Sequence, residues 1–385
     1  MVQSLKKKKF FIITTVPVSL NFFSGQTQVL KREFDVEVVS SSGIKMDSFG
    51  KKEEVKGHVI EMEREISFFN DLKSLLQLIF LFFRERPDII HGSTPKAGLL
   101  SMISGWMTRV PARIYYIHGL RYQGATGIKK KILITMEKLS CFFATDIFSV
   151  SAGVKEVLGT DQITMKKINI IGNGSVNGID IDYFSVKNPD IVDIRDHYNI
   201  GKDDFIFGFV GRIVKDKGIN ELVNSFLKIN KTFVETKLLL VGNYEDLLSP
   251  LDKAVKMEIE HNKNIINTGF QHDIRPFLKI MDIFVFPSYR EGFGVSLMEA
   301  AAMEVPIIAT DIIGCNEVIK EGYNGILIPP KSTEELMQTM EMLLLNKKKL
   351  EDISHVTRKF VIDKYEQKEL WEKTLEAYCK VVDSR

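Results

Sequence analysis

Cysteine is scarce in this chain of 385 residues. Its three cysteines, Cys141, Cys315 and Cys379, are odd in number and far apart in the sequence. Neither a disulfide framework nor a zinc site is predicted, because both need suitably spaced partner residues. The composition therefore excludes small disulfide-stabilised secreted domains and favours a reducing compartment, which we expect to be the cytosol.

A long hydrophobic run is also missing. The most apolar segment, Leu72–Phe83, is shorter than the roughly 20 residues that a helix needs to cross a bilayer. We predict a core helix here, with a helix lying on a membrane surface as the alternative. Phe10–Val18 is shorter still, and it is predicted to be the first buried strand rather than part of a signal peptide.

The net charge is small, with 52 Lys and Arg against 50 Asp and Glu, or +2. The first 185 residues are nevertheless basic overall, and the remainder is acidic. A basic half suits an anionic surface such as a membrane, although such an excess is also typical of a solvated face. We predict peripheral contact between the first half and the inner face of the cell membrane, and no nucleic-acid partner.

Apolar strand-like runs alternate with helix-like runs along the chain, which is typical of parallel sheets covered by helices on both faces. With 44% hydrophobic residues and this length, two doubly wound α/β domains are predicted. The predicted strands are Phe10–Val18, Phe34–Ser40, Asp88–His91, Arg113–His118, Ile147–Ser151, Ile168–Ile171, Phe205–Val210, Lys237–Val241, Ile265–Thr268, Ile283–Phe286 and Pro306–Ala309. The main predicted helices are Asp71–Arg84, Lys96–Thr108, Lys129–Phe143, Glu334–Leu345, Lys349–Lys364 and Lys368–Val382.

The segment Asn173–Phe184 is rich in Asn and Gly and is predicted to link the domains. We place the first domain at residues 1–180, the second at 181–365 and a C-terminal helix at 366–385. The linker contains Asp180 and Asp182, whose spacing suits a Mg²⁺ ion on a diphosphate. Because Asp and Asn are also common turn formers, we interpret this pair as part of the linker, and no metal is expected.

The stretch Pro287–Ala302 joins a predicted strand to a helix and contains two carboxylates, Glu291 and Glu299. Gly292 and Gly294 allow a ligand to approach the backbone closely, and the helix start behind them suits a phosphate. Carboxylates beside a phosphate site indicate that the ligand also has hydroxyl groups. A nucleotide sugar has both phosphates and hydroxyls. The alternative is a capped helix with two solvated glutamates.

Other candidate residues follow predicted strands. Arg212 and Lys217 precede a helix that begins near Ile219, and together they suit a diphosphate, although exposed cations on loops are common. His118 ends a strand at the edge where open α/β sheets bind ligands, with a purely structural histidine as the alternative. Glycine-bearing turns at the same kind of position contain Gly25, Gly211, Gly242 and Gly269, the last followed by Phe270.

The motifs FVGRIVKDKG, LLLVGN, TGF, FPSYREGFGVSLMEA and the linker NGIDIDYF, in this arrangement, resemble the retaining family-4 glycosyltransferases. The resemblance covers nearly the whole chain and is strongest over residues 205–330. The strings LNFFSGQ and YYIHGLRYQG are most similar to the branch that builds bacterial capsule, O-antigen and other lipid-linked glycans.

This resemblance implies the glycosyltransferase-B architecture, in which two Rossmann-like domains face each other across a cleft and the C-terminal helix packs on the first. The acceptor would bind the first domain and the nucleotide sugar the second. The resemblance assigns Arg212 and Lys217 to the diphosphate, Glu299 to the ribose, and Glu291 to the sugar hydroxyls. It also assigns His118 to the reacting centre, Phe270 to the base, and a donor-binding backbone to Gly211, Gly242, Gly292, Phe293, Gly294, Val295 and Ser296.

Gly25 matches the glycine of the first loop, where many family members have a pair of glycines and this sequence has one. The predicted function is transfer of a hexose or N-acetylhexosamine from a UDP-sugar to a lipid-diphosphate-linked or other glycan acceptor, with retention and without a metal or other cofactor. The alternatives are a nucleotide-sugar epimerase of the same architecture and a non-catalytic nucleotide-sugar-binding protein.

Overall fold

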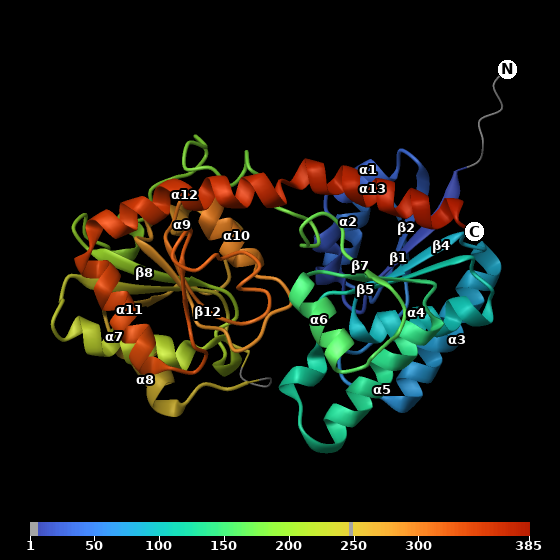
Figure 1. Ribbon diagram of the computed structural model, residues 1–385, viewed down its shortest axis with the longest axis horizontal. Helices are drawn as coiled ribbons and strands as arrows, with labels where there is room; N and C mark the ends of the chain where they lie inside the picture. The colour runs from blue at the N-terminus through green and yellow to red at the C-terminus, as the bar shows by residue number, and fades with distance from the viewer. Residues whose placement is uncertain (1–6, 246–248) are drawn as a thin grey trace. The chain divides into compact units, whose positions relative to one another are not determined.

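Two α/β units make up the chain in the computed structural model, which describes residues 7–245 and 249–385 (Figure 1). One unit contains residues up to Gly178 together with Gln367–Arg385, and the other contains Ile179–Glu366. The chain therefore passes from one unit to the other at two places, after Gly178 and after Glu366. The assignment of acceptor and donor to separate domains stays a prediction.

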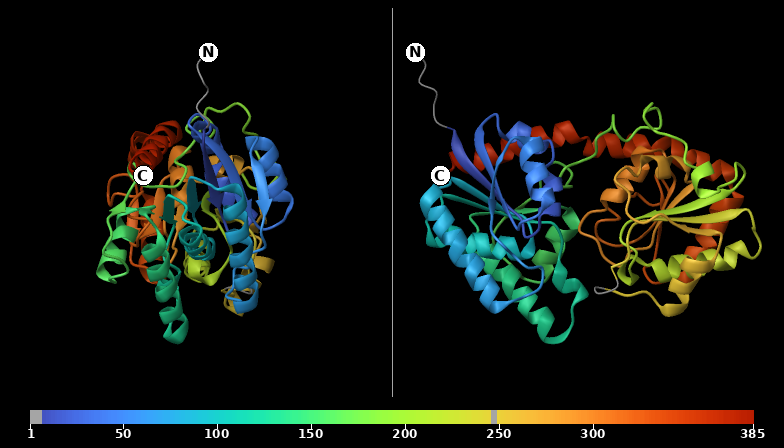
Figure 2. Two further views of the ribbon diagram at one scale, coloured as in Figure 1. Left: turned by 90° about the vertical axis from the view of Figure 1, so that its right-hand side faces the viewer. Right: turned by 180° about the vertical axis from the view of Figure 1, so that it is seen from behind.

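The first unit is built on a seven-stranded parallel sheet of order β3-β2-β1-β4-β5-β6-β7. The helices α3, α4 and α5 lie side by side along one face, and α1 and α13 lie on the other (Figure 1, Figure 2). The strands are β1 (Lys8–Ile13), β2 (Phe34–Ser40), β3 (Lys56–Val59), β4 (Ile89–Gly92), β5 (Ala112–Ile117), β6 (Asp146–Ser149) and β7 (Ile168–Asn169). The helices are α1 (Gln26–Leu30), α2 (Ile44–Glu53), α3 (Phe68–Glu85), α4 (Pro95–Met107), α5 (Gly127–Phe143), α6 (Ala152–Thr160) and α13 (Gln367–Asp383).

The second unit is built on a six-stranded parallel sheet of order β10-β9-β8-β11-β12-β13. Its strands are β8 (Phe205–Val210), β9 (Thr236–Val241), β10 (Ile265–Asn267), β11 (Ile283–Phe286), β12 (Ile307–Thr310) and β13 (Ile326–Ile328). Its helices are α7 (Ile219–Asn230), α8 (Lys253–His261), α9 (Arg275–Ile280), α10 (Val295–Ala302), α11 (Thr333–Leu345) and α12 (Lys347–Tyr365). The two sheets confirm the predicted class of two doubly wound α/β domains.

Each core lies along the central strands, which are covered on both faces. Phe11, Ile12 and Ile13 of β1 have no exposed surface, and neither do Ile283, Phe284 and Val285 of β11. Strands buried on both faces read as continuous apolar runs rather than as alternating ones. This is why both strands could be recognised in the sequence.

The predicted strand Phe10–Val18 was wrong at its end, because β1 stops at Ile13 and a 3₁₀ helix occupies Pro17–Phe23. Proline has no backbone N–H to donate to a strand neighbour and suits the first turn of a helix. The strands β3 and β13 were not predicted. They are short strands at the sheet edges, and the segment KGHV of β3 has no apolar pattern.

The expected core helix at Leu72–Phe83 was also wrong in part. These residues are helical, within α3, and Leu78, Leu81 and Phe82 are buried, but Phe80 and Phe83 are 65% and 70% exposed. The helix is apolar on two sides, and only one of them packs on the sheet. Within residues 7–245 and 249–385, we find no helix with the length and apolar character required to cross a membrane.

The linker turns at Asp180, as interpreted from the sequence. The Asp180 carboxylate accepts hydrogen bonds from the backbone N–H groups of Asp182 and Tyr183, at 3.1 and 2.9 Å. This is the local bonding by which Asp stabilises a turn. Ile179 pairs with Glu366 as an isolated bridge, so the two points where the second unit begins and ends lie side by side.

Candidate active site

The turn between β11 and α10 is held in place by a neighbouring loop. The backbone N–H of Gly294 donates to the Gly314 carbonyl at 3.1 Å, and a Cβ on Gly314 would lie 2.8 Å from the Glu291 Cβ. Neither Gly292 nor Gly294 has a positive φ. Gly294 is closely packed instead, since its Cβ would lie 2.5 Å from a Leu297 methyl and 3.1 Å from the Gly314 carbonyl oxygen.

Glu291 on this turn forms an ion pair with Lys217, which comes from the 3₁₀ turn Lys215–Lys217 after β8. Both side chains are largely buried, at 15% exposure for Lys217 and 14% for Glu291. The Lys217 ammonium also lies 5.3 Å from the centre of the Phe286 ring. Two of the predicted site residues, 74 positions apart, are therefore in direct contact.

Further contacts hold these two turns together. The N–H of Tyr289 donates to the Asp216 carbonyl at 2.9 Å, and the Arg290 guanidinium donates to the Asp216 carboxylate at the same distance. Gly218 has φ +72, and a Cβ there would lie 2.0 Å from the Pro287 carbonyl oxygen. Asp216 was not singled out in the sequence, although it lies inside the motif GRIVKDKG, because spacing does not show which loop it would contact.

Arg212 lies at the end of β8, and its guanidinium donates to the Glu245 carboxylate at 2.8 Å. No hydrogen bond or ion pair joins it to Lys217 or Glu291 within the described part of the chain. Its side chain is 43% exposed, so the pair with Glu245 is a weak surface interaction. Gly211, which precedes Arg212, lies close to Gly242, which follows β9. A Cβ on Gly242 would lie 1.8 Å from the Gly211 carbonyl oxygen.

Glu299 lies in α10, about one turn after Val295. Burial raises the pKa of its carboxyl to about 8, because the ionised form is poorly solvated there. At neutral pH this group is therefore predominantly a carboxylic acid that has both a donor and an acceptor. That state suits a pair of sugar hydroxyls, which also donate and accept.

Phe270 follows β10 and is 54% exposed. Its backbone N–H donates to the Asn243 side-chain oxygen at 2.9 Å, so the turn after β10 is tied to the turn after β9. The turn after β10 contains Gly269 with φ +67, a backbone conformation that favours glycine. The aromatic ring is presented at the carboxyl edge of the second sheet, as are Val295 and the half-buried Ser296 at the start of α10.

In the first unit, His118 follows β5 and packs against the rings of Phe22 and Tyr116, with ring centres 5.4 and 5.1 Å away. Burial lowers the pKa of its imidazole to about 3, so the ring is neutral. Neither ring nitrogen has a hydrogen-bond partner among the described residues. An unpartnered polar group of this kind is unusual in a folded protein and marks a candidate ligand contact.

Gly25 lies at the start of α1 with φ +77, and a Cβ there would lie 2.4 Å from the Trp371 ring of α13. Its N–H donates at 3.0 Å to Glu53, a buried carboxylate that also accepts from Ser24 at 3.1 Å. Glu53 and Trp371 were not identified as supports of this loop. Both are far from Gly25 in the sequence, and nothing in their own neighbourhoods signals the contact.

Structural comparison defines the fold. The chain superposes on HepE of Anabaena in complex with UDP-glucose with a TM-score of 0.81 at 17% identity, over 97% of this chain and 99% of the other. It superposes on sucrose-phosphate synthase from Thermosynechococcus elongatus with a TM-score of 0.78 at 18% identity, over 98% and 100%. These likenesses establish the glycosyltransferase-B fold.

Sequence comparison then gives the family. Residues 27–176 match the model described as Glycosyltransferase Family 4, and residues 190–360 match Glycosyl transferases group 1. The chain is 36% identical over 376 residues to the capsular polysaccharide biosynthesis glycosyltransferase CapM of Staphylococcus aureus, covering 97% of each. It is 28% identical over 278 residues to an Escherichia coli galactosyltransferase named for UDP-Gal and a GlcNAc-diphosphoundecaprenol acceptor, covering 69% of this chain and 68% of that one. The chain belongs to the family-4 glycosyltransferases, which confirms the predicted family.

Proposed function

We propose that this glycosyltransferase moves a hexose or N-acetylhexosamine from a UDP-sugar to a lipid-diphosphate-linked acceptor during capsule or related surface polysaccharide synthesis, at the inner face of the membrane. The observation that carries the donor side is the buried pair of Lys217 and Glu291 at the start of α10. The names of the Staphylococcus and Escherichia relatives support the pathway and the acceptor class.

In this proposal the diphosphate lies against Lys217, Arg212 and the backbone from Gly292 to Ser296, where the start of α10 offers unpaired N–H groups. Glu299 binds the ribose hydroxyls, and Phe270 lies against the base. Glu291 orients the hydroxyls of the donor sugar. Binding of the diphosphate draws the Lys217 ammonium toward the phosphate oxygens while Glu291 still fixes the lysine side chain.

Breaking the bond between the anomeric carbon and the phosphate oxygen leaves negative charge on the UDP and positive charge on the sugar ring. The cations and the helix start stabilise the leaving group, because donors already fixed in a site of low polarity need no reorganisation. The acceptor hydroxyl attacks the face from which UDP leaves, and its proton passes to a phosphate oxygen. This sequence of steps retains the anomeric configuration, and Glu291 forms no covalent intermediate.

His118 contributes as a neutral ring in this proposal. Its low pKa means that it adds no positive charge near the developing cation at the anomeric carbon. It orients the donor sugar through one ring nitrogen or through its own backbone carbonyl.

The anomeric configuration of the product tests the mechanism. It is read from the anomeric coupling constant by NMR, and an inverted product would contradict the mechanism.

A binding screen tests the donor class directly. Thermal unfolding is measured with UDP-, GDP- and ADP-sugars, and the right donor stabilises the folded protein by about 2.7 kcal/mol at one hundred times its Kd. We expect a shift with UDP-sugars that is lost in Lys217→Ala. Product analysis without an acceptor separates the other possibilities: a new UDP-sugar indicates an epimerase, and binding without turnover on any lipid acceptor indicates a non-catalytic protein.

A further inference from the structure

Two helices of the first unit, α3 and α5, which lie on either side of α4, expose apolar side chains in rows. On α3 the row faces away from the buried Leu78, and its members are 45 to 82% exposed. On α5 the row faces away from the buried Leu133, and its members are 39 to 78% exposed. The rows are Phe68, Phe69, Leu72, Leu76, Phe80 and Phe83 on α3, and Ile128, Ile132, Leu139 and Phe142 on α5.

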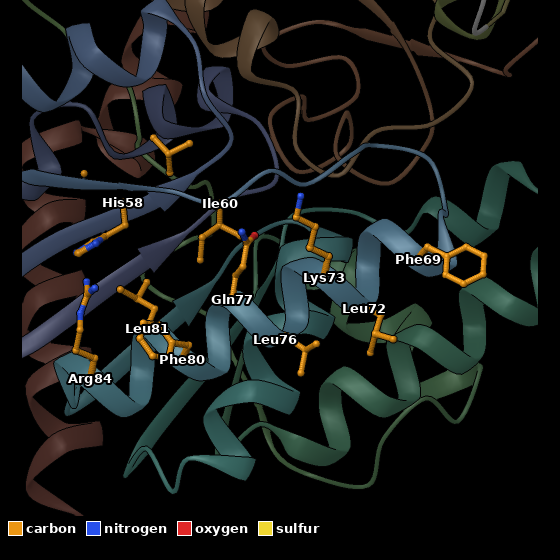
Figure 3. A pocket seen from close by; sticks show the side chains of 12 residues that line it. His58, Ile60, Phe69, Leu72, Lys73, Leu76, Gln77, Phe80, Leu81 and Arg84 are labelled. Carbon is orange, nitrogen blue, oxygen red and sulfur yellow. The ribbon is translucent and has the colours of Figure 1, made fainter.

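The spacing shows that these rows point outward. Residues four apart lie one above another on a helix, so Phe68, Leu72, Leu76 and Phe80 share one side. Figure 3 shows Leu72 and Leu76 on the side of α3 opposite to Lys73 and Gln77. Lys73 and Gln77 line a surface hollow of about 820 Å³ between α3 and the edge strand β3, and the apolar row contributes Phe69, Leu72, Leu76 and Phe80 to the same hollow. At 1.5 Å per residue, each helix presents a row roughly 21–23 Å long.

Within α3 and α5 the exposed charges are of one sign, and the exposed Glu63 and Glu65 lie just before α3. The exposed charged side chains of the two helices are all cationic, whereas their three carboxylates are buried or half-buried and paired, and Glu85 also accepts from Arg84 at 3.1 Å. Asp71 pairs with Lys96, Glu85 accepts from Lys9 at 2.8 Å, and the buried Glu137 accepts from the Tyr115 hydroxyl at 2.7 Å. The exposed cations are Lys73, Arg84, Lys129, Lys130, Lys131 and Lys138.

We propose that the outward faces of α3 and α5 are the surface by which this protein binds an anionic lipid bilayer, with the aromatic and leucine side chains inserted among the lipid chains and the cations at the phosphates. Helices that lie in a membrane interface combine these two features and sink about 5–10 Å into it. The proposal extends the proposed function, whose acceptor is carried by a membrane lipid, and it names the residues that make the contact.

Charge argues for a bilayer over a second copy of this chain. A symmetric pair would place the same patch on both partners, so that Lys73 and Lys138 would meet like charges in a buried interface. Lysine is depleted from such interfaces, and unpaired charges there are costly. An anionic bilayer neutralises the same lysines.

Vesicle sedimentation tests the proposal without donor or acceptor, so that its outcome is independent of the transferase activity. We expect the protein to sediment with vesicles of equal parts phosphatidylcholine and phosphatidylglycerol and to remain in solution with phosphatidylcholine alone. In Leu76→Ser/Phe80→Ser, sedimentation should fall at least tenfold. The matched control is Val234→Ser/Met257→Ser in the second unit, where the two side chains are 63% and 62% exposed, and it should bind as the wild type does.

A second variant tests the electrostatic part. Each basic residue near an anionic surface contributes roughly a factor of five to binding, so Lys131→Gln/Lys138→Gln should weaken sedimentation more than tenfold. Circular dichroism of each variant checks that it is folded. The proposal would be overturned if the wild-type protein did not bind anionic vesicles, or if the folded variants bound them as well as the wild type does. A dimer in solution that the Leu76→Ser/Phe80→Ser change dissociates, without vesicle binding, would instead identify a second copy as the partner.

Discussion

At the scale of single residues, the functional proposal depends most on Lys217. Replacing it with alanine removes the cation that pairs with Glu291 on the turn before α10 and leaves Glu291 without that partner. We expect kcat/KM for a UDP-sugar to fall about 10²–10³-fold, as when one preorganised donor to a developing anion is removed. Steady-state kinetics with saturating acceptor provide the measurement.

Lys215 is the matched control, since it lies in the same 3₁₀ turn. Its side chain is 48% exposed, and its ammonium pairs with Asp252 at 3.0 Å rather than with Glu291. Lys215→Ala should therefore change kcat/KM less than threefold or so, because exposed ion pairs contribute little. Equal losses in both variants would point to a general effect of charge on the loop and against a specific role for Lys217.

The Glu299 carboxyl should make the free energy of unfolding decrease as the pH rises. Its pKa in the folded protein is raised to about 8, above the ordinary value of about 4.3, so between these values the folded state binds a proton that the unfolded state has lost. The contribution of this group to the free energy of unfolding is therefore complete at low pH. It is lost as the pH rises toward 8, by at most about 1.4 kcal/mol per pH unit.

Urea unfolding from pH 5 to pH 8 measures this effect. Glu299→Gln keeps the shape and a donor but cannot ionise, so the free energy of unfolding of the variant should decline less over this range than that of the wild type. Parallel curves for the two proteins would show that Glu299 does not titrate as its burial implies. Glu299→Ala, which removes both the donor and the acceptor, should bind UDP more weakly if Glu299 contacts the ribose.

At the scale of elements, α13 supports the loop that carries Gly25. The Trp371 ring fills the space where a side chain at position 25 would lie, and its indole N–H donates to the Asn177 side chain at 2.7 Å. Gly25→Ala combines an unfavourable φ with this clash, and we expect it to lower the free energy of unfolding by about 1–3 kcal/mol. Denaturant unfolding is the measurement.

Gly127 separates the two causes. It has φ +57, similar to that of Gly25, but a Cβ there would meet no atom within 4 Å. Gly127→Ala should cost only the backbone strain, roughly 1 kcal/mol. If both substitutions cost the same, the contact with Trp371 contributes nothing to the position of the loop.

At the scale of the whole molecule, the proposed chemistry supplies its own positive charge. Arg212, Lys217 and the start of α10 take the place that a divalent ion would have on the diphosphate, so we propose that transfer needs no metal. Turnover with a UDP-sugar and a lipid-linked acceptor should persist within about twofold after treatment with EDTA. A loss that Mg²⁺ or Mn²⁺ restores would contradict this and would direct attention to carboxylates near the diphosphate.

Much of the architecture follows from local patterns in the sequence. The continuous apolar runs of β8 and β11 and the helix start at Ile219 lie where they were predicted, because buried parallel strands and amphipathic helices have distinct periodicities. The edge strands β3 and β13 were missed for the opposite reason. They are short, and they form strands only because β2 and β12 lie beside them and pair with them.

The sequence by itself determined the two-domain α/β class and the family, and it proposed the residues of the candidate site, because each rests on short motifs and on periodicity. Only the tertiary structure decided which of them touch. It joined Lys217 to Glu291, placed Trp371 against Gly25, and turned the apolar row of α3 outward when an apolar helix was expected to be buried. The physical reason is that contacts between residues far apart in the chain depend on how sheets and helices pack, which no local pattern records.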